Sequence, residues 1–395
     1  MDLVCKVQNY EWGTRGPQGL VAKIAASGGL VNNNSIAENS PFAEFWMGTH
    51  PNGPAKLLDS DVTLKHWLEA NQDALGDDEK AQFGNDLPFL FKVLAVAEPL
   101  SIQAHPEKKH AEELHRLKPD LYKDPNHKPE MVIAWSEAFE ALCGFRPEEE
   151  IRRFFNEVPS LQTLAGVPGL PGPSDGDFSQ ILKASFSRSM NCSQEDVKRE
   201  ISAHLDIIKE RNNDVAHQLF VRIAALYPDD VGCFCVYFMN YVILKRGEVM
   251  FLGPNIPHAY IFGECLECMA CSDNVVRAGL TPKFKDVETL CTMLDYQTGP
   301  VERFKLNWMK ENEYSSLCAP PVPDFSVAQI KVGPNEEYET IARRSASILL
   351  VMQGSAKIDA LPKGFGTVLF LRSNQTCRLI AEESLVVFQA FSNPQ

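Results

Sequence analysis

The sequence has no long apolar run, and no stretch approaches the roughly 20 apolar residues that a membrane-spanning helix needs. Its first residues, Met1 to Lys6, carry neither the basic lead nor the apolar core of an export signal.

Basic charge is also scarce, since 38 Lys and Arg stand against 52 Asp and Glu and give a formal net charge of −14. A chain this acidic has no general attraction to nucleic acid or to an anionic membrane. We therefore expect a cytoplasmic protein that binds neither. Nothing in the sequence is typical of an oligomer, so we expect a monomer.

The cysteines show no disulfide pattern. There are eleven, an odd number, and they stand in apolar contexts such as Cys233-Phe234-Cys235, which favours reduced, buried thiols. Cys265 and Cys268 have the spacing of a zinc knuckle or redox pair, and Cys271 follows, but no second pair lies at a matching distance. In an extended chain Cys265 and Cys268 would face opposite sides. We interpret all three as structural.

The 395 residues, 44% of them hydrophobic, leave room for two or three structural units. Short runs rich in β-branched and aromatic residues predict strands at Phe89–Val96, Met131–Trp135, Cys233–Leu244, Val249–Leu252, Ser347–Met352 and Leu385–Phe388. Apolar residues three or four apart predict helices at Lys108–Leu117, from Ser193 to Ile208 and at Val215–Leu226, and the run Gly166–Pro173 predicts a loop. Ser193 and Asp196 form a plausible capping box. The pattern indicates a mainly β protein with a helical insertion and jelly-roll barrels.

The segment Ser101 to His105 reads as a strand that carries Gln103 and His105 on one face. Glu130 and His258 are candidates to complete a metal site with them. Two imidazole nitrogens, a carboxylate and an amide oxygen suit zinc and tolerate other divalent metals. By itself Gln-x-His is weak evidence, because most strand histidines are satisfied by ordinary hydrogen bonds. No histidine follows His258, so the last unit lacks imidazole ligands.

Two segments resemble the motifs of cupins. Gly247 to His258, a strand between glycines followed by a Pro/Asn turn and His, is similar to the second cupin motif. Gln103-Ala104-His105 with the later Glu130 fits the first, with Gln in place of one His. The resemblance implies a metal-binding cupin domain at residues 1–146 and 229–320, a helical insertion at 147–228, and a metal-free cupin-like β domain at 321–395. The fold alone leaves the function open.

Six ordered segments resemble the type I mannose-6-phosphate isomerases (phosphomannose isomerases). They are Gln8–Gly13, Phe45–Pro51, Ser101–Pro106, His127–Met131, Pro257–Tyr260 and Ser272–Lys283. The resemblance covers nearly the whole chain. It implies one zinc ion per chain, held by Gln103, His105, Glu130 and His258, and interconversion of mannose 6-phosphate and fructose 6-phosphate through a cis-enediol. In that family the reaction supplies mannose 6-phosphate for GDP-mannose synthesis or consumes it for glycolysis.

The catalytic roles stay open at this point. His127, Lys128, Asp273 and Arg277 match family positions that line the active cleft. A metal cation and an Arg nearby would lower the pKa of Lys128 and make it a conceivable base. A contact with the phosphate fits Lys128 equally well. Asp273 fits either a base or a residue that holds Arg277 in a bidentate pair.

An anionic sugar phosphate, the expected partner, needs local positive charge that the whole chain does not supply. Ser101, Lys128, Arg277 and Lys283 are the main candidates for binding the phosphate, and Lys92 and Tyr260 are weaker ones. Trp12, Trp46, Glu44 and His50 could line the pocket or could equally be core and hydrogen-bonding residues of the N-terminal region.

Two other functions compete. An Fe(II) cupin oxygenase is disfavoured because Gln103 replaces a histidine. A non-catalytic cupin that binds sugar phosphate is disfavoured because the ligand set and the segment Ser272–Lys283 are complete.

Overall fold

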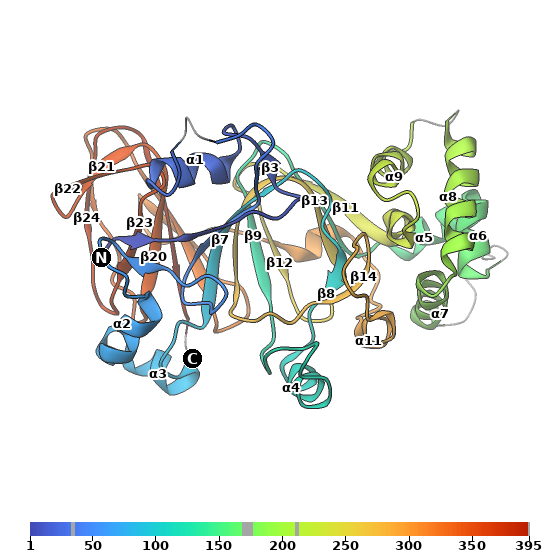
Figure 1. The fold of residues 1–395 in the computed structure, drawn as a ribbon, viewed down its shortest axis with the longest axis horizontal. Helices are drawn as coiled ribbons and strands as arrows, with labels where there is room; N and C mark the ends of the chain where they lie inside the picture. The colour runs from blue at the N-terminus through green and yellow to red at the C-terminus, as the bar shows by residue number, and fades with distance from the viewer. Residues whose placement is uncertain (33–35, 168–176, 210–212, 394–395) are drawn as a thin grey trace.

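In the computed structural model the described residues are 1–32, 36–167, 177–209 and 213–393. Figure 1 shows three regions along the long axis. The C-terminal strands lie at one end, a large sheet lies in the middle, and the helices of the insertion lie at the other end. The chain is mostly β with a helical insertion, as the sequence predicts. Within the described residues, no helix is both long and apolar enough to cross a membrane.

The middle region is an eleven-stranded antiparallel sheet that curls into a barrel. Its main path runs through β15 (Lys305–Leu306), β12 (Val249–Leu252), β9 (Glu130–Ala134), β13 (His258–Ala270), β7 (Phe89–Val96), β5 (Glu44–Met47) and β2 (Lys6–Gln8). Off this path lie β10 (Phe139–Phe145), β11 (Met239–Leu244), β8 (Ile102–Ala104) and β14 (Val276–Gly279). β7 and β12 have the predicted bounds, and every residue of β7 is buried, which explains why this strand is apolar apart from Lys92.

One strand belongs to both walls of this barrel. The first part of β13, up to Phe262, pairs with β10 and β8, and the part from Gly263 onward pairs with β7 and β9. The bend falls at Gly263, whose φ is +112°. A Cβ there would lie 2.6 Å from the carbonyl oxygen of Ala138. Only glycine fits this position, and the bend brings His258 next to β8.

The helical insertion lies between β10 and β11. It contains α5 (Glu148–Glu157), α6 (Pro159–Ala165), α7 (Phe178–Met190), α8 (Gln194–Ile208) and α9 (Val215–Leu226). The helices predicted near Ser193 and at Val215–Leu226 are confirmed. The Ser193 hydroxyl caps α8 by accepting from the Asp196 N–H at 3.1 Å. Of the predicted Gly/Pro-rich loop, Gly166 ends α6 with φ +66°, and residues 168–173 lie outside the described residues.

The strand predicted over Cys233–Leu244 is only half right. Val231–Phe234 forms a 3₁₀ turn and Cys235–Phe238 a short helix, α10, before β11 begins at Met239. All eight residues of these two turns are buried, and Phe238 packs against Phe155 and Phe186 of the insertion. A run that is apolar on every side fits a buried helical turn as well as a strand, so periodicity could not separate the two.

The C-terminal region is a sandwich of two antiparallel sheets. The larger contains β16 (Met309–Lys310), β17 (Ser315–Cys318), β18 (Ser326–Val332), β25 (Leu385–Phe391), β20 (Ser347–Gln353) and β23 (Val368–Leu371). The smaller contains β19 (Glu337–Glu339), β24 (Arg378–Ala381), β21 (Ser355–Ile358) and β22 (Leu361–Gly364). The two strands predicted here are confirmed. The outer face of the larger sheet shares one apolar core with the middle region, where Trp135 lies edge-on to Phe388.

Short elements cover the edges of the sheets. The helices are α1 (Leu20–Ser27), α2 (Leu64–Ala70), α3 (Asp77–Phe83), α4 (Lys108–Leu117, as predicted) and α11 (Val287–Met293). The remaining strands are β1 (Leu3–Val4), β3 (Thr14–Arg15), β4 (Pro41–Phe42) and β6 (Lys56–Leu57). All eleven cysteines lie in the described residues and are free. Cys265 and Cys268 point into different apolar cores on opposite faces of β13, which confirms the structural interpretation.

Candidate metal centre and cleft

Three neighbouring strands align the polar side chains of the site. β8 lies between β13 and β14, and the register places Gln103 opposite His258 on one side and opposite Arg277 on the other. Residues directly opposite each other in antiparallel strands share a face of the sheet. The fold therefore sets two of the predicted ligands and a candidate phosphate-binding arginine in one row.

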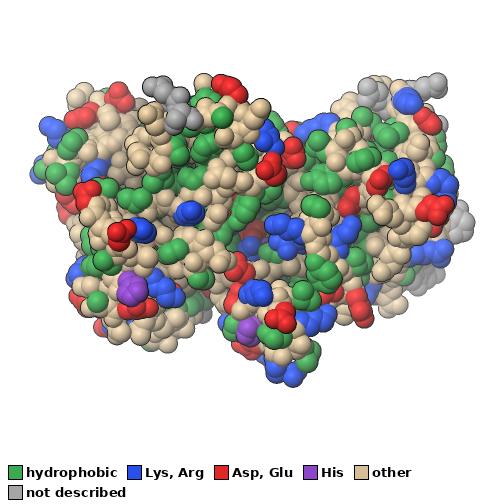
Figure 2. Space-filling view, in the orientation of Figure 1, with side chains coloured by type: hydrophobic (Ala, Val, Ile, Leu, Met, Phe, Trp, Pro, Cys, Tyr) green, Lys and Arg blue, Asp and Glu red, His purple; other side chains and the backbone are tan. Residues whose placement is uncertain are grey.

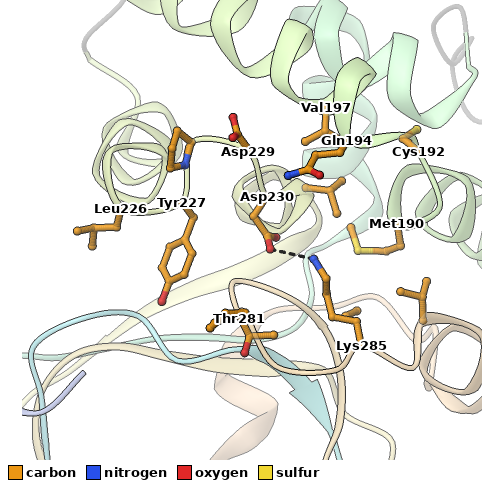
Figure 3. A pocket seen from close by; sticks show the side chains of 15 residues that line it. Met190, Cys192, Gln194, Val197, Leu226, Tyr227, Asp229, Asp230, Thr281 and Lys285 are labelled. Carbon is orange, nitrogen blue, oxygen red and sulfur yellow. Dashed lines mark hydrogen bonds and ion pairs between the residues drawn. The ribbon is translucent and has the colours of Figure 1, made fainter. Parts of the chain in front are cut away.

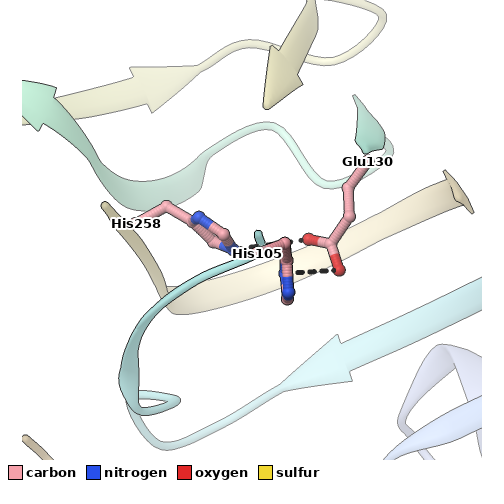
Figure 4. Close-up of side chains that lie close together, drawn as sticks. All are labelled: His105, Glu130 and His258. Atoms are coloured by element: carbon pink, nitrogen blue, oxygen red, sulfur yellow. Dashed lines mark ion pairs between the residues drawn. The ribbon is translucent and has the colours of Figure 1, made fainter. Parts of the chain in front are cut away.

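His105, Glu130 and His258 come together in the interior, as Figure 4 shows. One ligand atom from each lies within 4.8 Å of the others, and all three residues are buried. His105 Nε2 is 3.1 Å from Glu130 Oε1, and His258 Nε2 is 3.4 Å from Glu130 Oε2. The chain thus gathers two imidazoles and a carboxylate from three separate segments.

Backbone carbonyls fix the tautomers of both rings. His105 Nδ1 lies 2.7 Å from the carbonyl oxygen of Asn274, and His258 Nδ1 lies 2.9 Å from that of Ile256. Each Nδ1–H therefore donates to a carbonyl, and each Nε2 keeps its lone pair for another partner. Carbonyl partners of this kind are typical of metal-binding histidines.

An unpaired atom supports the fit of a metal. His105 Nε2 is buried and has no hydrogen-bond partner, although Glu130 is close, because an unprotonated nitrogen cannot donate to a carboxylate. A cation between them would satisfy both. Burial lowers the pKa of His105 to about 4, so the ring is neutral, as a ligand must be. The donor set fits one zinc ion.

Gln103 stands at the side of this group. Its Nε2 is 3.4 Å from His258 Nε2, and its Oε1 accepts from the Ser101 hydroxyl at 3.0 Å. A half-turn of the amide would exchange the two atoms and direct the oxygen toward the imidazoles. Ser101 would then accept from the amide nitrogen, since a hydroxyl can donate or accept.

Positive charge beside Glu130 keeps it ionised. Burial raises the pKa of Glu130, but neighbouring groups, among them Lys128, lower it more, and it stays well below its usual range. Lys128 Nζ lies 3.3 Å from Glu130 Oε1, and the Tyr260 hydroxyl oxygen lies 3.3 Å from Oε2. The carboxylate is therefore held as an anion from several sides.

A cleft of about 820 Å³ opens onto this group. Lys128, Asp273, Arg277, Lys283 and Ser101 line it together with Gln103 and Glu130. Within the described part of the chain, neither Arg277 nor Lys283 has a carboxylate within ion-pair distance. Burial lowers the pKa of both, and Arg277 lowers that of Lys283 further. Two neighbouring cations without an acidic partner form a site for an anion.

Lys92 and Tyr260 also line the cleft, but both side chains already interact with carboxylates. Lys92 Nζ lies 2.9 Å from Glu267 Oε2 and 3.5 Å from Glu44 Oε2. The Tyr260 hydroxyl donates to Glu267 Oε1 at 3.0 Å. Sequence reasoning missed Glu267, although an acid within the otherwise apolar run Cys265–Ala270 of β13 is a signal that could have identified it.

His127 and Asp273 have partners that the sequence did not indicate. His127 Nε2 is 3.0 Å from Asp324 Oδ1, and His127 is not among the residues that line the cleft. Asp273 lines the cleft but makes no contact with Arg277 among the interactions of the described residues. Its carboxylate lies 3.2 Å from His50 Nε2 and accepts from Asn52 Nδ2 at 3.0 Å.

The helical insertion forms part of the cleft wall. Leu226 and Tyr227, at the end of α9, line the cleft and also a second cavity of about 610 Å³ on their other side. Figure 3 shows this second cavity, across which Asp230 pairs with Lys285 at 3.1 Å. On the face seen in Figure 2, several basic side chains lie beside the hollow near the centre of the molecule.

The fold and the donor set define a cupin with a mononuclear metal site. Profiles described as "Phosphomannose isomerase type I, catalytic domain" and "Phosphomannose isomerase type I, helical insertion domain" match residues 1–148 and 157–239. Mannose-6-phosphate isomerase of Bos taurus is 44% identical over 98% of this chain and 97% of its own length. Mannose-6-phosphate isomerase 1 of Arabidopsis thaliana is 38% identical over 99% and 93%.

Solved structures of phosphomannose isomerases are similar to this chain over its whole length. A mutant phosphomannose isomerase from Salmonella typhimurium superposes with a TM-score of 0.86 at 30% identity, covering 99% of both chains. A zinc-bound mannose 6-phosphate isomerase gives 0.85 at 30% identity with the same coverage. The chain belongs to the type I phosphomannose isomerase family.

Proposed function

We propose that this protein is a zinc-dependent isomerase that interconverts D-mannose 6-phosphate and D-fructose 6-phosphate through a cis-enediol. The observation that carries the proposal is one cleft that reaches the His-Glu-His group at Glu130 and is also lined by Arg277 and Lys283, two cations with no ion-pair partner among the described residues. The relatives named above are mannose-6-phosphate isomerases, and one similar structure is zinc-bound. The product mannose 6-phosphate would feed GDP-mannose synthesis.

Gln103, His105, Glu130 and His258 would hold the zinc ion. When bound, zinc supplies positive charge that stabilises the sugar oxygens at C1 and C2. Arg277, Lys283 and Ser101 bind the phosphate at the other part of the cleft, because the arginine and lysine have no acidic partner there. The charge of Lys92 is already balanced by Glu44 and Glu267, so this residue lines the cleft without binding the phosphate.

Asp273 is the better placed of the two proposed bases. Its hydrogen bond with His50 lowers its pKa, so it is already an unprotonated acceptor at neutral pH. Lys128 Nζ lies 3.3 Å from Glu130 Oε1, and this place in the cleft suits it to stabilise negative charge on the sugar oxygens.

In the proposed step Asp273 takes the proton from C2, the electron pair of that bond forms the C1=C2 double bond, and the π pair of C1=O1 moves to O1, which takes a proton from water. Asp273 then returns its proton to C1, O2 gives its hydroxyl proton to the hydroxide left by that water, and O2 becomes the ketone oxygen, so that no proton is gained or lost overall.

The domain limits are proposed at 1–146 with 229–320, at 147–228 and at 321–395. Helices α5 to α9 fall within the second range, which supports it. Every residue of the proposed site comes from one chain, so a monomer suffices. Free cysteines throughout the chain fit a reducing compartment such as the cytoplasm.

A coupled assay for fructose 6-phosphate tests the reaction. Zinc-loaded protein should convert mannose 6-phosphate, and absence of turnover would refute the proposal. Oxygen uptake by iron-loaded protein would instead favour an oxygenase. For the ligands, His258→Ala should lose most of its zinc after dialysis, and full retention would contradict the assignment.

Isotope exchange tests the base. Asp273→Asn should abolish exchange of the C2 proton with solvent, because an amide cannot accept it. Lys128→Met should slow turnover while leaving detectable exchange. Normal exchange in Asp273→Asn would remove that residue as the base.

A further inference from the structure

The turn that follows β5 places a buried histidine against Asp273. His50 is 3% exposed and lies edge-on to the Trp46 ring, with ring centroids 4.9 Å apart. The backbone N–H of Asn52 donates to His50 Nδ1 at 3.2 Å. Because Nδ1 accepts, the proton of the neutral ring lies on Nε2, which is 3.2 Å from Asp273 Oδ1. His50 therefore presents a donor to the carboxylate from a fixed ring.

Asn52 completes the arrangement from the same turn. Its Nδ2 donates to Asp273 Oδ2 at 3.0 Å. On the other side, the backbone N–H of Asp273 donates to Asp124 Oδ2 at 2.8 Å. The main chain and both carboxylate oxygens of Asp273 are thus anchored, and rotation of the side chain would break at least one of these contacts. The carboxylate still lines the cleft.

The groups around Asp273 favour its ionised form. The hydrogen bond with His50 lowers the pKa of Asp273 most, Lys128 and Lys92 lower it further, and burial opposes them. The titratable groups that face Asp273 are His50, Asp124, Lys128, Lys92, Tyr10 and Cys271. Of these, His50 is the one whose side chain is within hydrogen-bonding distance of the carboxylate.

We propose that His50 is a positioning residue for the isomerisation and that, together with Asn52, it holds the Asp273 carboxylate in one orientation toward the sugar. This inference rests on the proposed function, in which Asp273 accepts the C2 proton. A carboxylate that rotates freely presents its lone pairs to C2 only part of the time. One held by two donors needs no reorientation in the transition state. His50 acts through Asp273 and does not itself contact the sugar.

Two substitutions of His50 separate its donor from its bulk. His50→Leu removes the donor and keeps an apolar contact with Trp46, whereas His50→Gln keeps an N–H donor. The kcat of zinc-loaded His50→Leu protein should fall about 10- to 100-fold, because misplacement of a reacting group costs that much. Its KM should stay within about threefold, since the phosphate contacts are untouched. His50→Gln should recover most of the loss.

The pH profile gives a second readout that a merely structural role would not change. In His50→Leu the acidic limb of kcat/KM should move to higher pH, because Asp273 loses the neighbour that lowers its pKa most. In an Asp273→Asn background, His50→Leu should cause no further loss of activity. His66→Leu, the same change on an exposed face of α2, is the matched control and should leave kcat unchanged.

Unchanged kcat and pH profile in His50→Leu protein of normal zinc content and melting temperature would overturn the inference, as would full additivity with Asp273→Asn. If His50→Leu does not fold, Asn52→Ala decides, because Asn52 is exposed; its kcat should fall severalfold, and an unchanged kcat would overturn the inference. Inactive wild-type protein with zinc bound would refute the proposed function instead.

Discussion

Arg277 and Lys92 are both cations of the cleft, but they differ in what balances their charge. Arg277 has no ion-pair partner among the described residues, whereas Lys92 is buried between Glu267 and Glu44. Burial lowers the pKa of Lys92, but the two carboxylates outweigh it and raise the pKa above its usual range. A free cation is available to a ligand, and a neutralised one mainly stabilises the fold.

Methionine at each position tests this contrast. Arg277→Met should raise the KM for mannose 6-phosphate about tenfold or more and change the unfolding free energy little, because it removes a ligand contact. Lys92→Met should lower the unfolding free energy by about 3 kcal/mol, because it leaves two buried carboxylates unpaired. Urea unfolding and steady-state kinetics on both variants measure this. The reverse pattern would contradict the assignment of the phosphate site.

Glu79 makes stability depend on pH. Its carboxylate, fully buried on α3, accepts from the Ala346 N–H and the Ser392 hydroxyl, and burial raises its pKa to about 7 from an ordinary 4.5. The folded state therefore binds the proton more tightly than the unfolded state. This contribution is complete below about pH 4.5 and is lost as the pH rises through about 7.

Relative to Glu79→Gln, the wild type should lose up to about 3 kcal/mol of unfolding free energy between pH 5 and pH 8, at about 1.4 kcal/mol per pKa unit. Glutamine keeps both hydrogen bonds, since its oxygen can accept from Ala346 and its nitrogen can donate to Ser392. Unfolding curves of both proteins at the two pH values measure the effect. A constant difference between the proteins would show that Glu79 does not titrate in this range.

At this scale the sequence predicted which residues gather but not how they pair. Gln103 and His105 follow from strand periodicity, and the family motifs pointed to Glu130 and His258. Arg277 was one of two open interpretations for Asp273, and the contacts with His50 and Asn52 were not anticipated, because these donors come from a turn more than 200 residues earlier. No local pattern reports such a contact.

Among the helices and strands, some bounds could be predicted from the local sequence, and others depend on contacts with distant segments. The bounds of β7, β12, α4 and α9 follow from periodicity and length, since each strand is a mainly apolar run and each helix has a regular apolar face. The segment Cys233–Phe238 did not follow, because burial by the insertion helices decides its conformation. Apolar content alone does not fix the backbone there.

The start of α8 offers a test at the scale of one element. Ser193→Ala should lower the unfolding free energy by about 1 kcal/mol, because the first turn of the helix loses the acceptor for the Asp196 N–H. Ser193→Asp should retain stability, since aspartate also caps a helix. Amide hydrogen exchange in α8 locates the effect. Faster exchange spread evenly over the sheets and not concentrated in the insertion would contradict it.

At the scale of the whole molecule, the C-terminal sandwich is continuous with the catalytic sheet. One apolar core runs between them, and the N-terminal amine of Met1 donates to the carbonyl of Phe370 at 2.9 Å. The sequence predicted the strands of this region but no role for it. The fold shows a polar link as well, because Asp324, just before β18, lies 3.0 Å from His127 Nε2.

This link supports the segment that carries two site residues. His127 immediately precedes Lys128, and β9 begins at Glu130, so the contact with Asp324 fixes the start of the strand on which a proposed zinc ligand lies. Asp324 is 4% exposed, and its removal leaves the imidazole without that acceptor.

Asp324→Ala should therefore lower the unfolding free energy by about 1 to 3 kcal/mol and speed the release of zinc to a chelator. Asp324→Asn keeps an acceptor oxygen and should retain zinc like the wild type. Chelator-release rates and urea unfolding of both variants measure the effect. If Asp324→Ala loses stability but releases zinc at the wild-type rate, the C-terminal sandwich supports the fold without positioning the metal centre.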